Sequence, residues 1–168
     1  MAKLFETENK SGKHELKWKI LARLAPPLWA SGGRIRFVSA NWQEVHVSLR
    51  LRPLTRNIVG TIFGGSLYSS VDPIYMLMWM KILGDDYIIW DKAATIQFVR
   101  PGKGKLRARF LISDDEVKQV LELFKENDEF DREFQVIYVN ERNKVVARIG
   151  KTIYFAKKDF YDNFKRKK

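Results

Sequence analysis

The stretch from Asn57 to Asp72 holds the residues whose types and spacing could do chemistry. Gly64 and Gly65 stand at the start of an apolar run that predicts a helix, where the first backbone N–H groups have no acceptor within the helix. These groups and the positive end of the helix dipole can bind a negative or polarised oxygen, and glycine lets a ligand approach the backbone closely. Asn57 adds an amide that donates and accepts hydrogen bonds. The pattern indicates a site for an anion or a polarised carbonyl group.

Asp72 places a carboxylate in the same apolar run, seven residues after Gly65. Burial should raise the pKa of this carboxyl and make it a better base. A structural interpretation stays open, in which the glycines serve close packing and Asp72 bonds to the backbone beside a kink at Pro73. Seven residues span about 10 Å of helix, whereas reacting groups must lie within roughly 3 Å of the reacting atoms. One helix can hardly bring both ends of the run to one site, whereas two antiparallel copies of the helix could.

The surrounding elements predict an α+β fold with an antiparallel sheet curled around one apolar helix. The clearest strand covers residues 43–52, where alternating apolar residues predict one buried face; His46 falls on the other face and is interpreted as an ordinary surface residue. The helix over residues 64–83 is apolar almost all round and should be buried on nearly every side. Ser113 and Glu116 form a capping box that predicts the start of a short helix. Helices are predicted over 14–30, where Pro26 and Pro27 should end or distort the helix, over 64–83 and over 114–125, and strands over 34–39, 43–52, 87–100, 105–112, 133–141 and 144–157.

The composition bounds the function classes. A chain of 168 residues with 45% hydrophobic residues is expected to form one soluble globular domain. The absence of cysteine and the presence of two histidines exclude a disulfide scaffold and a cysteine nucleophile, and leave almost no material for a Ser-His-Asp triad or a metal site. The formal net charge of +11 favours an anionic partner. With no signal peptide or membrane span recognised, we expect a cytoplasmic protein.

Several motifs resemble those of the hotdog-fold thioesterases of the phenylacetic-acid-degradation type (PaaI-like). Asn57, Gly60, the Phe63-Gly64-Gly65 triplet and Asp72 match that pattern, with Phe63 in the place of its histidine. The sequence is more similar still to the hotdog branch known as domain of unknown function 4442, over roughly residues 30–155. The motifs that carry this second likeness are GTIFGGSLY at 60–68, VDP at 71–73, WDKAA at 90–94 and RPGKG at 100–104. The resemblance implies a hotdog fold. We expect this single domain to span residues 14–157, including the N-terminal helix, between a flexible segment at 1–13 and a basic tail at 158–168.

The resemblance also implies an acyl-CoA thioesterase with a site shared between two subunits of a homodimer or dimer of dimers. Asp72 would activate water or attack directly, Asn57 would orient the water or the thioester, and a backbone amide of Gly64 or Gly65 would polarise the carbonyl. Coenzyme A enters only as part of the substrate, and no cofactor or metal is expected. The residues expected to bind the substrate are Gly60, Phe63, Ser66, Arg100, Lys103 and Lys105, the basic ones through phosphates.

Other functions stay open. A non-catalytic hotdog protein that binds acyl-CoA or lipid is the main alternative, because Phe63 cannot make the hydrogen bonds of the motif histidine. The basic residues of the 100–107 turn could also be a solvated hairpin face. A hotdog dehydratase is disfavoured, because the site offers no histidine. A nucleic-acid binder would explain the charge but not Asn57, the glycine pair or Asp72.

Overall fold

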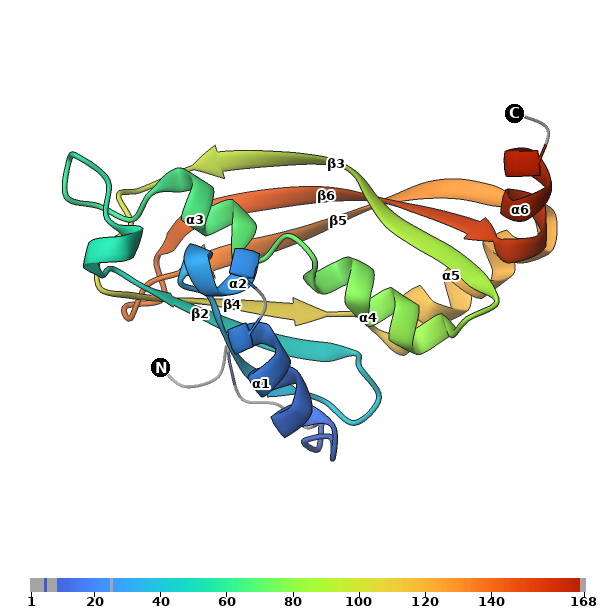
Figure 1. The fold of residues 1–168 in the computed structure, drawn as a ribbon, viewed down its shortest axis with the longest axis horizontal. Helices are drawn as coiled ribbons and strands as arrows, with labels where there is room; N and C mark the ends of the chain where they lie inside the picture. The colour runs from blue at the N-terminus through green and yellow to red at the C-terminus, as the bar shows by residue number, and fades with distance from the viewer. Residues whose placement is uncertain (1–4, 6–8, 25, 167–168) are drawn as a thin grey trace.

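The computed structural model describes Phe5 and residues 9–24 and 26–166, and it has the predicted α+β architecture (Figure 1). All neighbouring strands pair antiparallel in one sheet with the order β1-β2-β4-β5-β6-β3. The strands are β1 (Arg34–Val38), β2 (Glu44–Arg50), β3 (Tyr87–Phe98), β4 (Lys105–Leu111), β5 (Glu129–Val139) and β6 (Val145–Lys157). The helices are α1 (Glu15–Leu24), α2 (Pro26–Ser31), α3 (Gly64–Ser69), α4 (Ile74–Leu83), α5 (Asp114–Glu126) and α6 (Lys158–Arg166), with a short 3-10 turn, η2 (Pro53–Thr55).

Alternation of side chains gives the sheet one buried and one open face, as predicted. On β2, the side chains of Val45, Val47 and Leu49 are at most 2% exposed. Val47 and Leu49 lie opposite Ala108 and Leu106 of β4, which are also buried. Apolar residues every second position therefore form the layer that receives the helices.

The central helix is broken, contrary to the prediction of one helix over residues 64–83. The chain leaves α3 at Ser70 and begins α4 after Pro73. Pro73 has no N–H to continue the helical ladder, and the Ser70 hydroxyl bonds to the Ser66 carbonyl at 2.6 Å and to the buried Tyr138 hydroxyl at 2.7 Å. The break places Asp72 in a turn between two helices rather than within one.

The core lies between α4 and the inner face of the sheet. The rings of Tyr75 and Trp79 pack on Phe134, with centroids 5.1 and 5.6 Å apart. Trp79 and Met78 are fully buried, but Met80 on the opposite side of α4 is 42% exposed. The expectation that this helix is buried on nearly every side is therefore wrong, because the sheet covers only one side of it.

Two helices, α1 and α2, stand where one was predicted over residues 14–30, and α2 begins at Pro26. On α1, the apolar side chains of Leu16 and Ile20 are 68% and 48% exposed. Before α1, Ser11 pairs with Ser39, while Gly12 N–H donates to the Val38 carbonyl. Of the segment predicted to be flexible, residues 1–4 and 6–8 lie outside the described residues.

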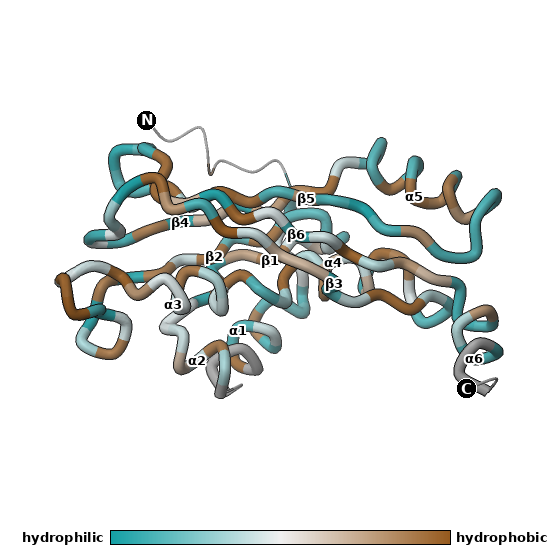
Figure 2. Tube along the Cα trace, turned by 90° about the horizontal axis from the view of Figure 1, so that it is seen from above, coloured by the Kyte–Doolittle hydropathy of each residue, from teal (hydrophilic) through white to brown (hydrophobic). Residues whose placement is uncertain are grey.

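The two ends of the molecule differ in what they carry (Figures 1 and 2). Helices α5 and α6 lie at one end, so most of the predicted basic tail forms a helix, while residues 167–168 lie outside the described part. The other end is made of connections: η2 and the loop after it, the turn between β3 and β4, and the turn between β5 and β6. Among the described residues, no helix is long and apolar enough to cross a bilayer.

Candidate functional site

The loop before α3 is closed by the predicted site residue Asn57. Its side-chain amide donates to the Thr61 hydroxyl and its side-chain oxygen accepts from the Thr61 N–H, both at 2.9 Å. Gly60 in this loop has a φ of +81°, a left-handed conformation that favours glycine. The tip residues Ile58 and Val59 are 102% and 76% exposed. Asn57 therefore shapes the loop that carries it.

The two glycines at the start of α3 have no side chains, and aromatic rings occupy the space beside them. A Cβ on Gly64 would lie 2.8 Å from the Phe98 ring, and one on Gly65 would lie 2.3 Å from the Phe63 ring. Phe63 and Phe98 are each more than half exposed, and they line a hollow of about 620 Å³ between the loop and the end of β3. The hollow is lined by Asn57, Ile58, Val59, Thr61, Ile62, Phe63, Gly64, Leu67, Phe98, Val99, Arg100, Pro101 and Gly102. Ser66, expected to bind substrate, is instead buried.

Asp72 lies at the turn after α3, and its side chain is 42% exposed. The expectation of a carboxylate buried in an apolar helix is therefore wrong, because the helix ends before it. Its Oδ1 accepts a hydrogen bond of 2.6 Å from the Lys151 ammonium of β6. Lys151 Nζ also lies 3.3 Å from the Tyr68 hydroxyl and 3.0 Å from Asp91 Oδ1 on β3. Four polar side chains from α3, the turn, β3 and β6 thus meet at one point.

Burial and charge act in opposite senses in this cluster. Burial by itself lowers the pKa of Lys151, but hydrogen bonds and charges from Asp72 and Asp91 outweigh it, so the pKa lies above the usual lysine value. Burial raises the pKa of Asp91, although Lys151 opposes the rise. The pKa of the Tyr68 hydroxyl is raised by burial and by its hydrogen bond to Asp72. Lys151 is therefore a charged ammonium at neutral pH.

Sequence reasoning missed Lys151, although a signal for it exists. In β6 the inward positions Ile149, Ile153 and Phe155 are fully buried, and Lys151 occupies the same alternation. A lysine on the apolar face of a strand must have a charged partner, which the sequence offers in the two acidic residues of the motifs VDP and WDK.

The cluster adjoins a second hollow, of about 470 Å³, lined by Tyr68, Asp91 and residues 92–96 of β3. The first hollow uses Gly64 and Leu67 of α3 and Phe98 of β3. Because both hollows lie between α3 and β3, they follow one another along these two elements. We call this surface the α3–β3 groove: it is apolar near Gly64 and polar near Asp91.

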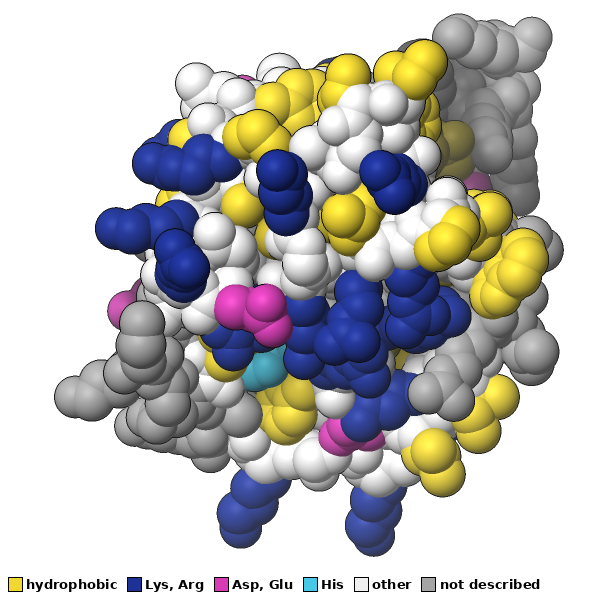
Figure 3. Space-filling model, turned by 90° about the vertical axis from the view of Figure 1, so that its left-hand side faces the viewer, with side chains coloured by type: hydrophobic (Ala, Val, Ile, Leu, Met, Phe, Trp, Pro, Cys, Tyr) yellow, Lys and Arg dark blue, Asp and Glu magenta, His cyan; other side chains and the backbone are white. Residues whose placement is uncertain are grey.

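The predicted phosphate-binding residues are not all on one surface. Arg100 lines the apolar hollow, and its guanidinium donates to the Val145 carbonyl at 2.6 Å. Lys103 is exposed in the connection that follows. Lys105 lies opposite Arg50 in the register of β2 and β4, on the open face of the sheet. The alternation of side chains along β4 puts Arg107 on that face too. Figure 3 shows Lys and Arg side chains gathered on this end of the molecule, with apolar side chains beside them.

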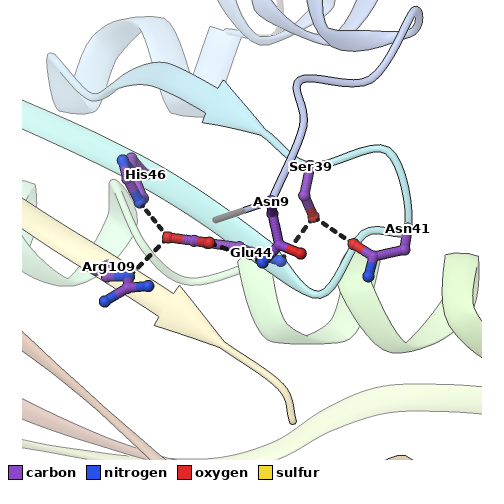
Figure 4. Close-up of polar contacts among 6 residues, drawn as sticks. All are labelled: Asn9, Ser39, Asn41, Glu44, His46 and Arg109. Carbon is purple, nitrogen blue, oxygen red and sulfur yellow. Dashed lines mark hydrogen bonds and ion pairs between the residues drawn. The ribbon is translucent and has the colours of Figure 1, made fainter. Parts of the chain in front are cut away.

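A second polar cluster surrounds Glu44 at the start of β2, away from the groove (Figure 4). The Glu44 carboxylate is fully buried and accepts bonds from Arg109 Nε at 2.6 Å and Asn9 Nδ2 at 2.9 Å. His46 Nε2 lies 2.7 Å from the same carboxylate. His46, interpreted from sequence as an ordinary surface residue, is therefore part of a contact that holds the N-terminal segment on the sheet. Within the described residues, no group of three or more His, Cys, Asp and Glu could hold a metal ion.

The sequence matches the family model of DUF4442, a domain of unknown function, over residues 13–155. The chain belongs to this family. Comparison of this DUF4442 sequence with curated proteins finds no match. Its fold is nevertheless shared with hotdog-fold proteins of known structure, which confirms the predicted fold.

Three of these similar structures show how far the likeness extends. A Pseudomonas aeruginosa protein of unknown function, described as a probable thioesterase, has a TM-score of 0.75 at 16% identity, over 88% of this chain and 98% of its own. A Haemophilus influenzae thioesterase has a TM-score of 0.64 at 14% identity, over 90% and 96%. The Escherichia coli PaaI protein of the phenylacetic acid degradation operon has a TM-score of 0.57 at 18% identity, over 85% and 94%. At these identities the likeness is one of fold.

Proposed function

We propose that this DUF4442 protein hydrolyses the thioester of an acyl-CoA. The observation that carries the proposal is the Asp72 carboxylate, which is partly open to solvent while its 2.6 Å partner Lys151 is fully buried. Tyr68 and Asp91 of the same cluster line the α3–β3 groove. A carboxylate held in this way can accept a proton from a water that attacks the thioester carbon, or attack that carbon itself. The similar structures named as thioesterases agree with this chemistry.

The site is proposed to be shared between two copies of the chain. β3 is the last strand of the sheet, with twelve residues, and its residues 92–95 are exposed. A long edge strand with free backbone groups is a template for pairing with another strand. Antiparallel pairing of two β3 strands would bring the Gly64 end of one groove toward the Asp72 end of the other. A backbone amide of Gly64 or Gly65 could then polarise a carbonyl that Asp72 of the second copy serves.

The two parts of the substrate have different places in this proposal. The acyl group takes the hollow walled by Phe63 and Phe98, since both rings are exposed there. Arg100, at its rim, and Lys103, on the next connection, would meet the phosphates of coenzyme A. Because Lys105 lies on the open face of the sheet, it would contact only a substrate that extends around the edge of the sheet. The absence of cysteine suits a cytoplasmic place for this activity.

A second candidate is binding of acyl-CoA without hydrolysis. Phe63 favours it, because the phenyl ring cannot donate or accept the hydrogen bonds that a histidine offers at this position. The Asn57 side chain, with its donor and acceptor engaged by Thr61, favours it as well. Binding and hydrolysis differ in whether free thiol is released.

The test is a panel of acyl-CoA thioesters of different chain length, with release of free thiol as the readout. We expect turnover of at least one member and a fall of at least ~100-fold for Asp72→Asn, the lower end of what a general base contributes. The control is Asp128→Asn, which removes a carboxylate that pairs with a lysine at 2.9 Å outside the groove.

Parental thiol release by Asp72→Asn would remove Asp72 from the mechanism. If no member of the panel is hydrolysed but an acyl-CoA still raises the melting temperature of the protein, binding without hydrolysis replaces hydrolysis as the function.

A further inference from the structure

The side chain of Lys151 is the most deeply buried charge of the cluster beside the groove. It is 0% exposed, and its strand neighbours on the same face, Ile149 and Ile153, are also fully buried. A charged amine in such surroundings is strongly unfavourable unless it is paired and hydrogen-bonded. An uncharged side chain of similar length would fill the space without this penalty. Packing alone therefore does not explain why a lysine occupies this position.

The contacts of Lys151 lead to Asp72. Its Nζ binds Asp72 Oδ1 at 2.6 Å, and this carboxylate reaches solvent at 42% exposure while the amine does not. The Tyr68 hydroxyl lies 3.3 Å from the same Nζ, next to the Asp72 carboxylate. The ammonium and the phenol thus approach the carboxylate from the protein side. Such contacts fix the rotamer of a side chain that stands on a turn, where the backbone alone would not.

Asp91 acts against Lys151 in the same cluster. It lies 3.0 Å from Nζ and is 20% exposed, and it brings a second carboxylate to one ammonium. An ammonium beside a carboxylate favours the ionised form of that carboxylate, whereas a neighbouring carboxylate disfavours it. Tyr68 on α3 is a further titratable group of the cluster, with its hydroxyl 3.3 Å from Lys151 Nζ. Lys92 follows Asp91 in β3, and its ammonium pairs with the carboxylate of Asp131 on β5.

We propose that Lys151 is the positioning residue of the site, which orients the Asp72 carboxylate and places a positive charge against it, while Asp91 opposes this charge from β3. The proposal rests on the proposed function only for its kinetic consequence. Its electrostatic part requires no substrate. A merely structural Lys151 would alter stability, but it would not give Lys151 and Asp91 opposite effects on the titration of Asp72.

The test follows the titration of the Asp72 side-chain carboxyl carbon by NMR in protein labelled with 13C-aspartate, assigned by its loss in Asp72→Asn. The variants are Lys151→Met, Lys151→Arg and Asp91→Asn. We expect Lys151→Met to move the midpoint up by roughly one pH unit or more, the usual size of an effect from an opposite charge at this distance. We expect Asp91→Asn to move it down, and Lys151→Arg to keep most of the parental value.

The matched control is Lys157→Met, which removes a lysine of the same strand that pairs with Asp128 at 2.9 Å on the surface. It should leave the midpoint unchanged. If Lys151→Met does not fold, Lys151→Gln takes its place, because the test needs an uncharged side chain at this position. Shifts of the same sign in Lys151→Met and Asp91→Asn, or no shift in either, would overturn the proposal.

The kinetic readout separates this proposal from the proposed function. If hydrolysis occurs, the acid limb of kcat/KM should follow the NMR midpoint in each variant. Hydrolysis that depends on Asp72, with an acid limb unmoved in Lys151→Met, would refute the role of Lys151 and leave the thioesterase proposal standing. Opposite NMR shifts without any hydrolysis would support the role of Lys151 and refute the thioesterase proposal.

Discussion

Glu44→Ala tests how strongly burial changes the contribution of an ion pair in this protein. The Glu44 carboxylate is 0% exposed and lies 2.6 Å from Arg109 Nε. Glu122 pairs with Lys125 at the same distance, but the two side chains are 66% and 68% exposed. The two pairs therefore have the same distance, but Glu44 is buried and also contacts Asn9 and His46, whereas Glu122 is exposed.

The expected loss at Glu44 follows from its partners. Removing one member of a buried ion pair costs about 3–5 kcal/mol, because the other charge is left unpaired. Arg109 keeps 28% exposure and His46 keeps 12%, so water can reach Arg109 in part, and we expect a value near ~3 kcal/mol. For a chain of this length that corresponds to a fall in melting temperature of roughly 9 °C. Glu122→Ala should cost less than about 0.5 kcal/mol.

The assay is urea unfolding at neutral pH, followed by circular dichroism and analysed by linear extrapolation. Glu44→Gln should lie between Glu44→Ala and the parent, because the amide oxygen can still accept from Arg109 while the amide nitrogen cannot. Free energies of unfolding for Glu44→Ala and Glu122→Ala that agree within about 1 kcal/mol would refute the reasoning, since burial would then make no difference.

Two further predictions concern α5 and the groove. Ser113→Ala should lower the free energy of unfolding by about 1 kcal/mol, because the Ser113 hydroxyl accepts from the Glu116 N–H at 3.1 Å; a Ser113→Gly variant that unfolds at the same urea concentration as Ser113→Ala would contradict a capping role. Burial raises the pKa of Asp91, so the folded state favours its protonated form and stability is lost as the pH rises through the folded-state pKa. Asp91→Asn should therefore gain stability relative to the parent as the pH rises above the ordinary pKa of an aspartate, and an equal pH dependence in both proteins, measured by urea unfolding, would contradict this.

The parts of the fold that sequence could predict are those in which one local rule acts alone. The alternation of Val45, Val47 and Leu49 is sufficient for a strand with one buried face, and the Ser113 capping box is sufficient for the start of α5. β5 begins at Glu129, earlier than the predicted residue 133, because its first residues pair with β6 while acidic side chains point to solvent. Pairing energy from the neighbouring strand is not visible in the local sequence.

The break in the central helix depends on tertiary contacts. Apolar composition cannot distinguish one helix from two, and a proline can either kink a helix or start a new one. The bond from Ser70 to the hydroxyl of Tyr138, a residue of β5, favours the second outcome. The environment of Asp72 follows from that break, so the expectation of a buried carboxylate failed together with the expectation of a continuous helix. That sequence reasoning found Asp72 but missed Lys151 has the same origin, because their contact joins residues 79 positions apart.

The pairing of Lys151 also bears on chemical self-damage. A neutral amine beside an activated acyl group undergoes aminolysis, which would leave the enzyme carrying a permanent amide. An ammonium has no lone pair with which to attack, and the two acids around Nζ stabilise this form and raise its pKa. A protein that handles thioesters would therefore keep this lysine inert in the presence of its own substrate, and mass spectrometry after prolonged incubation should find Lys151 unacylated while exposed lysines acquire acyl groups.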